Sequence, residues 1–164
     1  MKHLRLLLSF ATLHLAFVMP ALAADVTITA ANFRPGAGAK FHTGIAGATV
    51  TAGQPIAISP STGKFVLADG NDVDLVNIIG VAAHAAIDTQ PLAVVWYADD
   101  MTPGFTLVMS TMFYGVSATA GGIAPVADLS AGGVFPHAFI VAISTTKCKI
   151  RCPGLLGSAL SVAP

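Results

Sequence analysis

Glutamate is absent from this chain of 164 residues, so that its eight acidic residues are all aspartates. Glu and Lys are common on the exposed faces of helices, whereas this sequence favours Val, Ile, Thr and Phe and is interrupted by 16 Gly and 10 Pro. The interruptions leave apolar runs of strand length, and Asp25 to Thr29 (DVTIT) alternates like a strand with one buried face. The sequence therefore predicts an all-β fold, a compact sandwich or small barrel.

The first 23 residues follow the order of a secretory signal peptide. Lys2 and Arg5 precede an uncharged run, 6–19, and small residues follow up to Ala23, after which cleavage is expected. The run has 14 residues, whereas a helix needs roughly 20 to cross a bilayer. We therefore expect a hydrophobic N-terminal helix in a signal-like leader, 1–23, with no stable membrane span, followed by a single β domain over 24–164.

Charge is scarce along the whole chain. Charged residues make up 10% of it, the formal net charge is zero and the mean hydropathy is +0.76. A folded domain with so few charges must hide apolar surface in its core or against partners. The balance of charges gives no basic character, which argues against a nucleic-acid partner.

Two segments of the sequence resemble each other. Residues 47–69 (GATVTAGQPIAISPSTGKFVLAD) and 104–128 (GFTLVMSTMFYGVSATAGGIAPVAD) share a leading Gly, a Thr two residues later, a Ser-x-x-x-Gly turn and a final Ala-Asp. Each is followed by an apolar run, at 78–82 and 139–143. This pattern suggests two similar units, about 47–82 and 104–143, which are offset by about 60 residues and packed into one domain. The alternative is chance, because strands rich in Gly, Thr, Val and Ala match one another easily.

Residues that could carry catalysis are few. Outside the leader the histidines are His42, His84 and His137, and the last two stand near the ends of apolar runs, as histidines at the rim of a core do. No Gly-x-Ser-x-Gly elbow is present to expose a nucleophile. We therefore predict no catalytic, cofactor-binding or metal-binding residues, and no enzymatic activity.

Other polar and aromatic pairs have simple structural explanations. Asp99-Asp100 is typical of a solvated turn rather than of paired catalytic acids. The glycine-rich stretch 36–40 lacks the spacing of a phosphate loop. Trp96-Tyr97 ends an apolar run, which favours a role in the core or in an interface.

Cys148 and Cys152 are the two cysteines of the chain. In an extended strand their Cα atoms would lie roughly 13 Å apart, and a disulfide requires about 7 Å or less. They are therefore either free thiols or a disulfide, which could form only across a bend or between chains. An exported chain would favour the disulfide.

Several segments together resemble a group of small tailed-phage virion proteins related to capsid decoration and head-fibre proteins. The resemblance spans roughly residues 24–146 and is carried by the order and spacing of these segments: ADVTITAANFRPGAGAK, GIAGATVTAGQPIAIS, TGKFVLAD, IIGVAAH, QPLAVV and VSATAGGIAPVADL. It implies a β-rich, non-enzymatic structural protein that binds the major capsid protein of an assembled head. A homo-oligomer, with a trimer preferred, and a virion location are implied with it.

The leader departs from this pattern, because proteins of the group usually begin with Met directly before the ADVTITAAN segment. Phage heads assemble in the cytoplasm, where a signal peptide has no use. The alternative function is therefore an exported, non-enzymatic β-rich binding or surface module, located in the periplasm or secreted after cleavage at Ala23.

Overall fold

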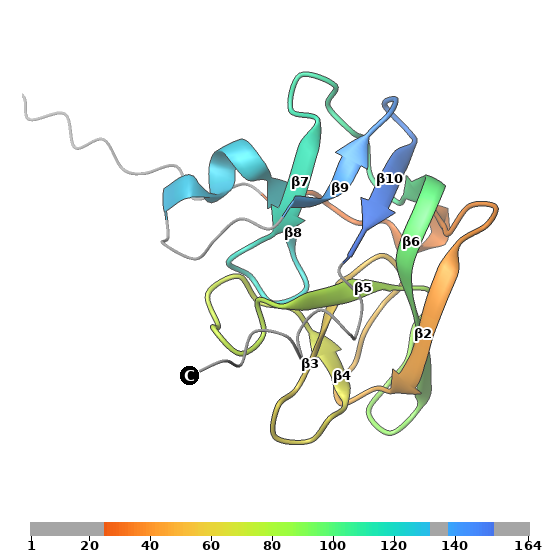
Figure 1. The fold of residues 1–164 in the computed structure, drawn as a ribbon, viewed down its shortest axis with the longest axis vertical. Helices are drawn as coiled ribbons and strands as arrows, with labels where there is room; N and C mark the ends of the chain where they lie inside the picture. The colour runs from red at the N-terminus through yellow and green to blue at the C-terminus, as the bar shows by residue number, and fades with distance from the viewer. Residues whose placement is uncertain (1–24, 132–137, 153–164) are drawn as a thin grey trace, which may run out of the picture.

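The structure, a computed structural model, describes residues 25–131 and 138–152. Within this part of the chain 43% of residues lie in strands and no α-helix is formed, which confirms the all-β prediction. The sheet curls into a half-barrel rather than forming a sandwich of two sheets (Figure 1). The expected leader helix and the ends of the predicted domain lie outside the described residues.

The strands form one ten-stranded sheet with the order β4-β3-β5-β6-β10-β9-β7-β8, while β1 and β2 also pair with β6. The strands are β1 (Phe33–Arg34), β2 (Lys40–Ile45), β3 (Pro55–Ile58), β4 (Phe65–Leu67), β5 (Ile78–Ala82), β6 (Pro91–Pro103), β7 (Phe113–Val116), β8 (Ile123–Pro125), β9 (Ala138–Ala142) and β10 (Cys148–Arg151). Two short 3-10 helices, η1 (Ala30–Asn32) and η2 (Val126–Ala131), complete the described elements.

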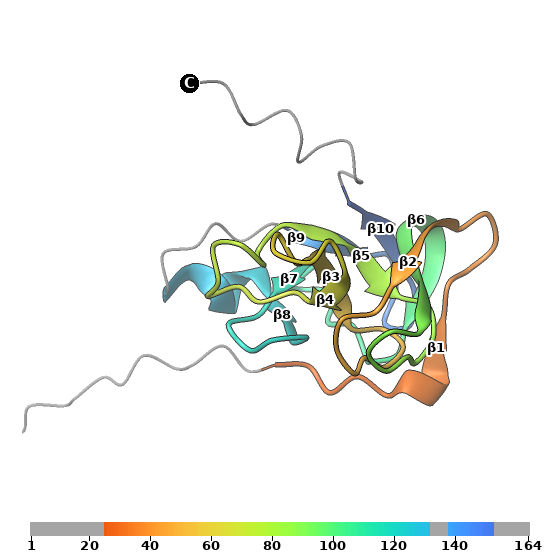
Figure 2. The same cartoon turned by 90° about the horizontal axis from the view of Figure 1, so that it is seen from below.

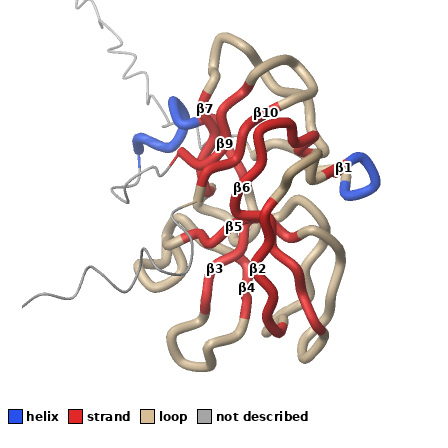
Figure 3. Tube along the Cα trace, turned by 45° about the vertical axis from the view of Figure 1, so that its right-hand side comes forward, coloured by secondary structure: helices blue, strands red, loops and turns tan. Residues whose placement is uncertain are grey.

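The longest strand, β6, joins the two parts of the sheet. Its first half pairs with β2 and β5, and its second half pairs with β10 and β1. Figure 3 shows it running from the group of β2, β3 and β4 to the group of β7, β9 and β10. Pro91 begins β6 and Pro55 begins β3, as expected for a residue that has no N–H to donate to a ladder.

Two groups of three strands have the same order, β4-β3-β5 and β8-β7-β9. In each group the strand that comes first in the chain, β3 or β7, lies in the middle. Their hairpins also share a register, because Ile56 pairs with Leu67 in one and Tyr114 with Pro125, each 58 residues later, in the other. Each middle strand has an irregularity where it meets its third strand, after Ile56 in β3 and after Tyr114 in β7. These strands lie within the ranges 47–82 and 104–143 of the two units suggested by the sequence.

Two clusters of buried side chains form the core, and neighbouring residues of one strand contribute to different clusters. Val94 belongs to the smaller cluster and Val95 to the larger, because successive side chains of a strand point to opposite faces. All five residues of β5 are buried, as the apolar run in its sequence predicts, and Ile78 and Ile79 are likewise divided between the two clusters. The curled sheet therefore buries both of its faces along β5 and β6.

The segment Asp25–Thr29, predicted to be a strand, is not one. Val26 donates to the carbonyl of Ile123 and Thr29 to that of Gly104, both at 2.8 Å, but two isolated bonds do not make a ladder. The alternating pattern still has its expected effect, because Val26 and Ile28 pack against the larger cluster. Figure 2 shows the segment running along the sheet toward β1.

Candidate functional site

An aromatic and cationic cluster lies where β2 and β10 meet β6. The guanidinium of Arg151 lies 4.0 Å from the centre of the Tyr97 ring, and the Lys40 ammonium lies 5.1 Å from the same centre. Both residues are the strand partners of Tyr97, in β10 and β2 respectively. Pairing to a common residue therefore holds two cations against one ring, an arrangement worth about 0.5–1 kcal/mol per contact at an exposed site.

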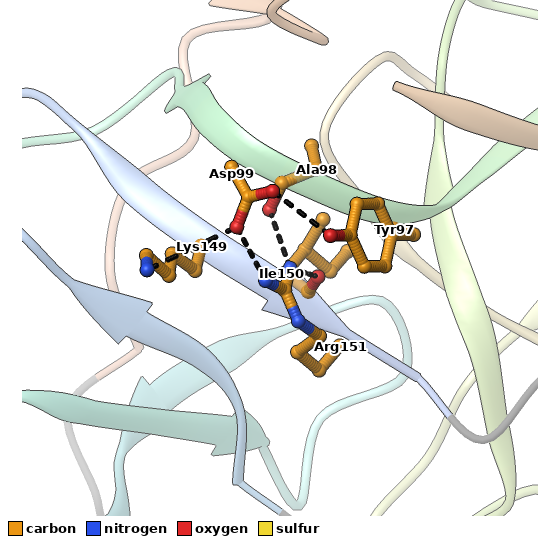
Figure 4. A network of polar contacts seen from close by, with 6 residues as sticks. All are labelled: Tyr97, Ala98, Asp99, Lys149, Ile150 and Arg151. Carbon is orange, nitrogen blue, oxygen red and sulfur yellow. Dashed lines mark hydrogen bonds and ion pairs between the residues drawn. The ribbon is translucent and has the colours of Figure 1, made fainter. Parts of the chain in front are cut away.

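Asp99 is the acceptor at the centre of this cluster (Figure 4). It accepts hydrogen bonds from Arg151 and from the Tyr97 hydroxyl, the latter at 2.9 Å, and the Lys149 ammonium lies 3.9 Å away. Two hydrogen bonds hold the pKa of Asp99 below its ordinary value: the one from Arg151 has the larger effect and the one from Tyr97 the next largest. Arg151 also donates to the carbonyls of Ala98 and Ile150, both at 2.9 Å. The cluster is satisfied internally, so its geometry favours fastening β10 to β6 over catalysis.

His42 packs beside this cluster rather than in a catalytic arrangement. Its ring stacks on Trp96, with ring centres 5.4 Å apart and planes inclined by 14°. Its Nε2 atom is buried without a hydrogen-bond partner, and burial lowers the pKa of His42. The neutral ring is therefore favoured, and Trp96 serves packing, as its position at the end of an apolar run indicates.

The remaining residues considered for catalysis are not brought together. His84 Nε2 accepts the Ala93 N–H at 3.1 Å, which leaves the proton on Nδ1 to donate to the Ala85 carbonyl at 2.9 Å. His84 is thus a satisfied histidine at the rim of the core. Asp99 and Asp100 are exposed, but the predicted turn is wrong, because both lie within β6. Asp99 takes part in the cluster above, and Asp100 pairs with Lys147 at 3.2 Å. His137 lies outside the described residues.

The two cysteines are free thiols and both are buried. Cys148 lies within β10, where its sulfur contacts the carbonyl oxygen of Met101 at 3.5 Å, and Cys152 follows the end of the strand. Burial raises the pKa of both thiols to about 12. Neither is therefore a nucleophile at neutral pH, because the thiolate is the reactive form.

An open cleft of about 530 Å³ lies between the N-terminal segment, the end of β6 and the turn between β9 and β10. We name it the threonine cleft, because five of its nine lining residues are threonines; the lining is Thr27, Thr29, Asn32, Arg34, Thr102, Gly104, Phe105, Thr106 and Thr146. Pairing of Phe33 with Pro103 and of Arg34 with Thr102 fixes one wall against the other. Local sequence patterns do not reveal this cleft, because its residues meet only through the tertiary structure.

A second surface feature is apolar. Five large hydrophobic side chains that are 43–52% exposed lie before and at the start of β7 and just after β9, and we name them the apolar end: Val108, Met109, Met112, Phe113 and Ile143. The two segments are joined, because Phe113 pairs with Val141 and the Ala142 N–H donates to the Met112 carbonyl at 2.7 Å. The apolar end therefore belongs to neighbouring segments rather than to scattered residues.

Within the described residues, no group of three or more His, Cys and Asp has the arrangement of a metal site. No helix in that part of the chain has the length and apolarity needed to cross a membrane. No protein-family model matches the chain, and no curated protein matches it.

Proposed function

We propose that the protein is a structural virion protein, related to capsid decoration or head-fibre proteins, that coats an assembled phage head as a homo-oligomer. The observation that carries the proposal is the apolar end. Five large apolar side chains remain nearly half exposed there, and contiguous apolar surface on a folded domain is typical of a surface that is covered in the working assembly.

The backbone at the apolar end supports a role for this surface. Met112 has a φ of +54°, in the left-handed region that side chains other than Gly, Asn and Asp seldom adopt. Such a conformation costs roughly 1–2 kcal/mol, and strained positions are concentrated at functional surfaces. Methionine is also enriched in interfaces, where its flexible side chain adapts to a partner.

The identity of the larger assembly rests on the sequence resemblance. A decoration protein needs neither a catalytic centre nor a net charge, and it can bury apolar surface against other copies and against the major capsid protein. Both properties suit a chain with 10% charged residues and no net charge. A trimer is the preferred oligomer by the same resemblance.

The two-unit organisation is part of this proposal. The hairpins β3–β4 and β7–β8 have turns that end in glycines of positive φ, Gly63 at +68° and Gly121 at +75°. In both turns a serine N–H donates a hydrogen bond across the turn. Ser59 donates to the Lys64 carbonyl, and Ser117 donates to the Gly122 carbonyl. These matching turns and the common register of the hairpins support a duplicated unit spanning 47–82 and 104–143.

The alternative is an exported, non-enzymatic binding or surface module. The signal-like order of residues 1–23 is the observation that favours it. N-terminal sequencing of native material distinguishes the two: Ala24 as the first residue of periplasmic or secreted protein favours export, whereas a start at Met1 or near Ala24 within purified phage heads favours decoration.

Sedimentation of the purified protein tests the role of the apolar end. We expect the wild-type chain to be oligomeric and to co-sediment with phage heads, and the double variant Met112→Ser/Phe113→Ser to be monomeric with weakened head binding, because the exposed apolar area is lost. Val73→Ser is the matched control, because Val73 is 77% exposed but lies in the loop between β4 and β5. A wild-type monomer without affinity for heads contradicts the proposal, as does equal behaviour of the two variants.

A further inference from the structure

The threonine cleft is lined by groups that suit a hydroxylated ligand. A threonine hydroxyl can both donate and accept a hydrogen bond, and the Asn32 amide adds two donors and an acceptor. Five threonines and one asparagine thus provide a varied set of partners in a cleft of about 530 Å³, within the 300–1,000 Å³ of small-molecule sites. None of the described residues that line the cleft is an acid, so a negatively charged ligand meets no repulsion from them.

Arg34 is the one charged residue among the described residues that line the cleft. Its Nη1 atom donates to the carbonyls of Ala31, at 2.8 Å, and Phe33, at 2.6 Å, which fixes the plane of the guanidinium. The other Lys and Arg side chains among the described residues already have partners. Four are paired with aspartates, namely Lys64, Lys147, Lys149 and Arg151. Lys40 lies against the rings of Trp96 and Tyr97. Arg34 has no such partner in that part of the chain. Because Nη1 already donates to two carbonyls, its Nε and Nη2 atoms are the donors left for a ligand.

Phe105 gives the cleft an apolar wall. Its ring lies 5.5 Å from that of Tyr114, inclined by 59°, and is partly buried against the larger core cluster. The contact with Tyr114 restrains the ring, and a restrained aromatic ring offers a flat surface to the C–H face of a sugar. The cleft therefore combines hydroxyls, a single oriented cation and one aromatic surface.

From this combination we propose that the threonine cleft binds a sugar acid, a ring that carries several hydroxyls and one carboxylate. The planar fork of an arginine matches a carboxylate with two parallel hydrogen bonds. A simple anion would leave the threonine hydroxyls unused, and a neutral sugar would leave Arg34 unpaired. A phosphate would meet only one cation and no helix N-terminus of useful length, since η1 has three residues.

This inference is independent of the proposed role in a virion. The residues that line the threonine cleft lie within 27–34 and 102–106 and at 146, whereas those of the apolar end lie within 108–113 and at 143. A sugar acid can be free or can be the terminal residue of a polysaccharide, and both present the same chemistry to the cleft.

Titration of the full chain with sodium glucuronate, followed by amide NMR shifts, tests the proposal. We expect saturable shifts confined to the lining of the cleft, and glucose, acetate and inorganic phosphate each binding at least about tenfold more weakly. Arg34→Met should weaken glucuronate binding by about tenfold or more, because hydrogen bonds to a charged group are lost. Thr106→Val, which keeps the shape of the side chain, should weaken it roughly two- to tenfold.

Lys64→Met is the matched control, because Lys64 is a cation of another surface that pairs with Asp88, and it should leave the affinity unchanged. If Arg34→Met perturbs the fold, the Thr106→Val result decides the outcome. Oligosaccharides ending in glucuronate, compared with glucuronate itself, distinguish a polysaccharide end from a free sugar acid. The proposal is overturned if glucuronate gives no saturable shifts, if acetate or phosphate binds equally well, or if neither variant weakens binding.

Discussion

At the scale of single residues, burial decides the chemistry of the two thiols. Cys148 pairs with Met101 of β6 and Cys152 follows the end of β10, and desolvation raises the pKa of each thiol to about 12. In the unfolded chain these groups titrate near their ordinary value of 9.0. Their contribution to stability is therefore complete below pH 9 and is lost as the pH rises toward 12.

We predict that a disulfide-exchange reagent added at neutral pH reacts slowly with the folded protein and rapidly, with both thiols, after denaturation. The folded chain keeps the thiols protonated and covered, whereas unfolding removes both effects. Cys152→Ser should leave one reactive thiol in the denatured chain. Rapid reaction of the folded protein, or no free thiol after denaturation without reductant, would contradict this assignment.

At the scale of elements, the close approach of β5 to β6 depends on glycine. Gly80 has a φ of +151°, and a Cβ atom at this position would lie 2.3 Å from the Val95 carbonyl oxygen. That oxygen belongs to the backbone of β6, so neither strand can move aside without disturbing the ladder. A side chain here is excluded by both conformation and space.

We therefore expect Gly80→Ala to lower the free energy of unfolding by about 2–5 kcal/mol, from strain and overpacking combined. Gly38→Ala is the control, because Gly38 has a φ of +71° but a methyl group added there would meet no atom within 4 Å; it should lose only about 1–2 kcal/mol. Denaturant unfolding monitored by circular dichroism measures both. Equal losses in the two variants would show that contact with β6 is unimportant.

The elements show where local sequence was sufficient. Buried runs such as 78–82 and turns such as Ser-x-x-x-Gly were predicted, because apolar pattern and turn chemistry act over a few residues. The segment Asp25–Thr29 has the pattern of a strand, but within the described residues its backbone N–H groups make only two isolated hydrogen bonds, to the carbonyls of Ile123 and Gly104. Pairing depends on a neighbouring strand, which local pattern does not specify.

At the scale of the whole molecule, β5 and β6 link the two core clusters. Val94 and Ile79 belong to one cluster, and Val95 and Ile78 belong to the other. Loss of either strand would expose side chains of both clusters. The described part of the chain should therefore behave as one cooperative unit.

We predict a single unfolding transition, with the same midpoint for probes in each cluster. Ile56→Val removes a methyl group from the smaller cluster and Ile140→Val from the larger, and each should cost about 0.5–1.5 kcal/mol. Hydrogen exchange or NMR peak intensities should show that either variant lowers the midpoint of both clusters equally. Separate transitions, or an effect confined to the altered cluster, would mean that the clusters unfold independently.

Sequence alone determined the all-β class, the apolar run that β5 buries and the structural role of Trp96, because these depend on residue type and short-range pattern. Only the tertiary structure decided that the sheet curls into a half-barrel, that β6 pairs with four other strands, and that Arg34 lines one cleft with Thr102, Thr106 and Thr146. Those contacts join residues far apart in the chain. Their formation depends on the balance of all pairings at once, which no local pattern encodes.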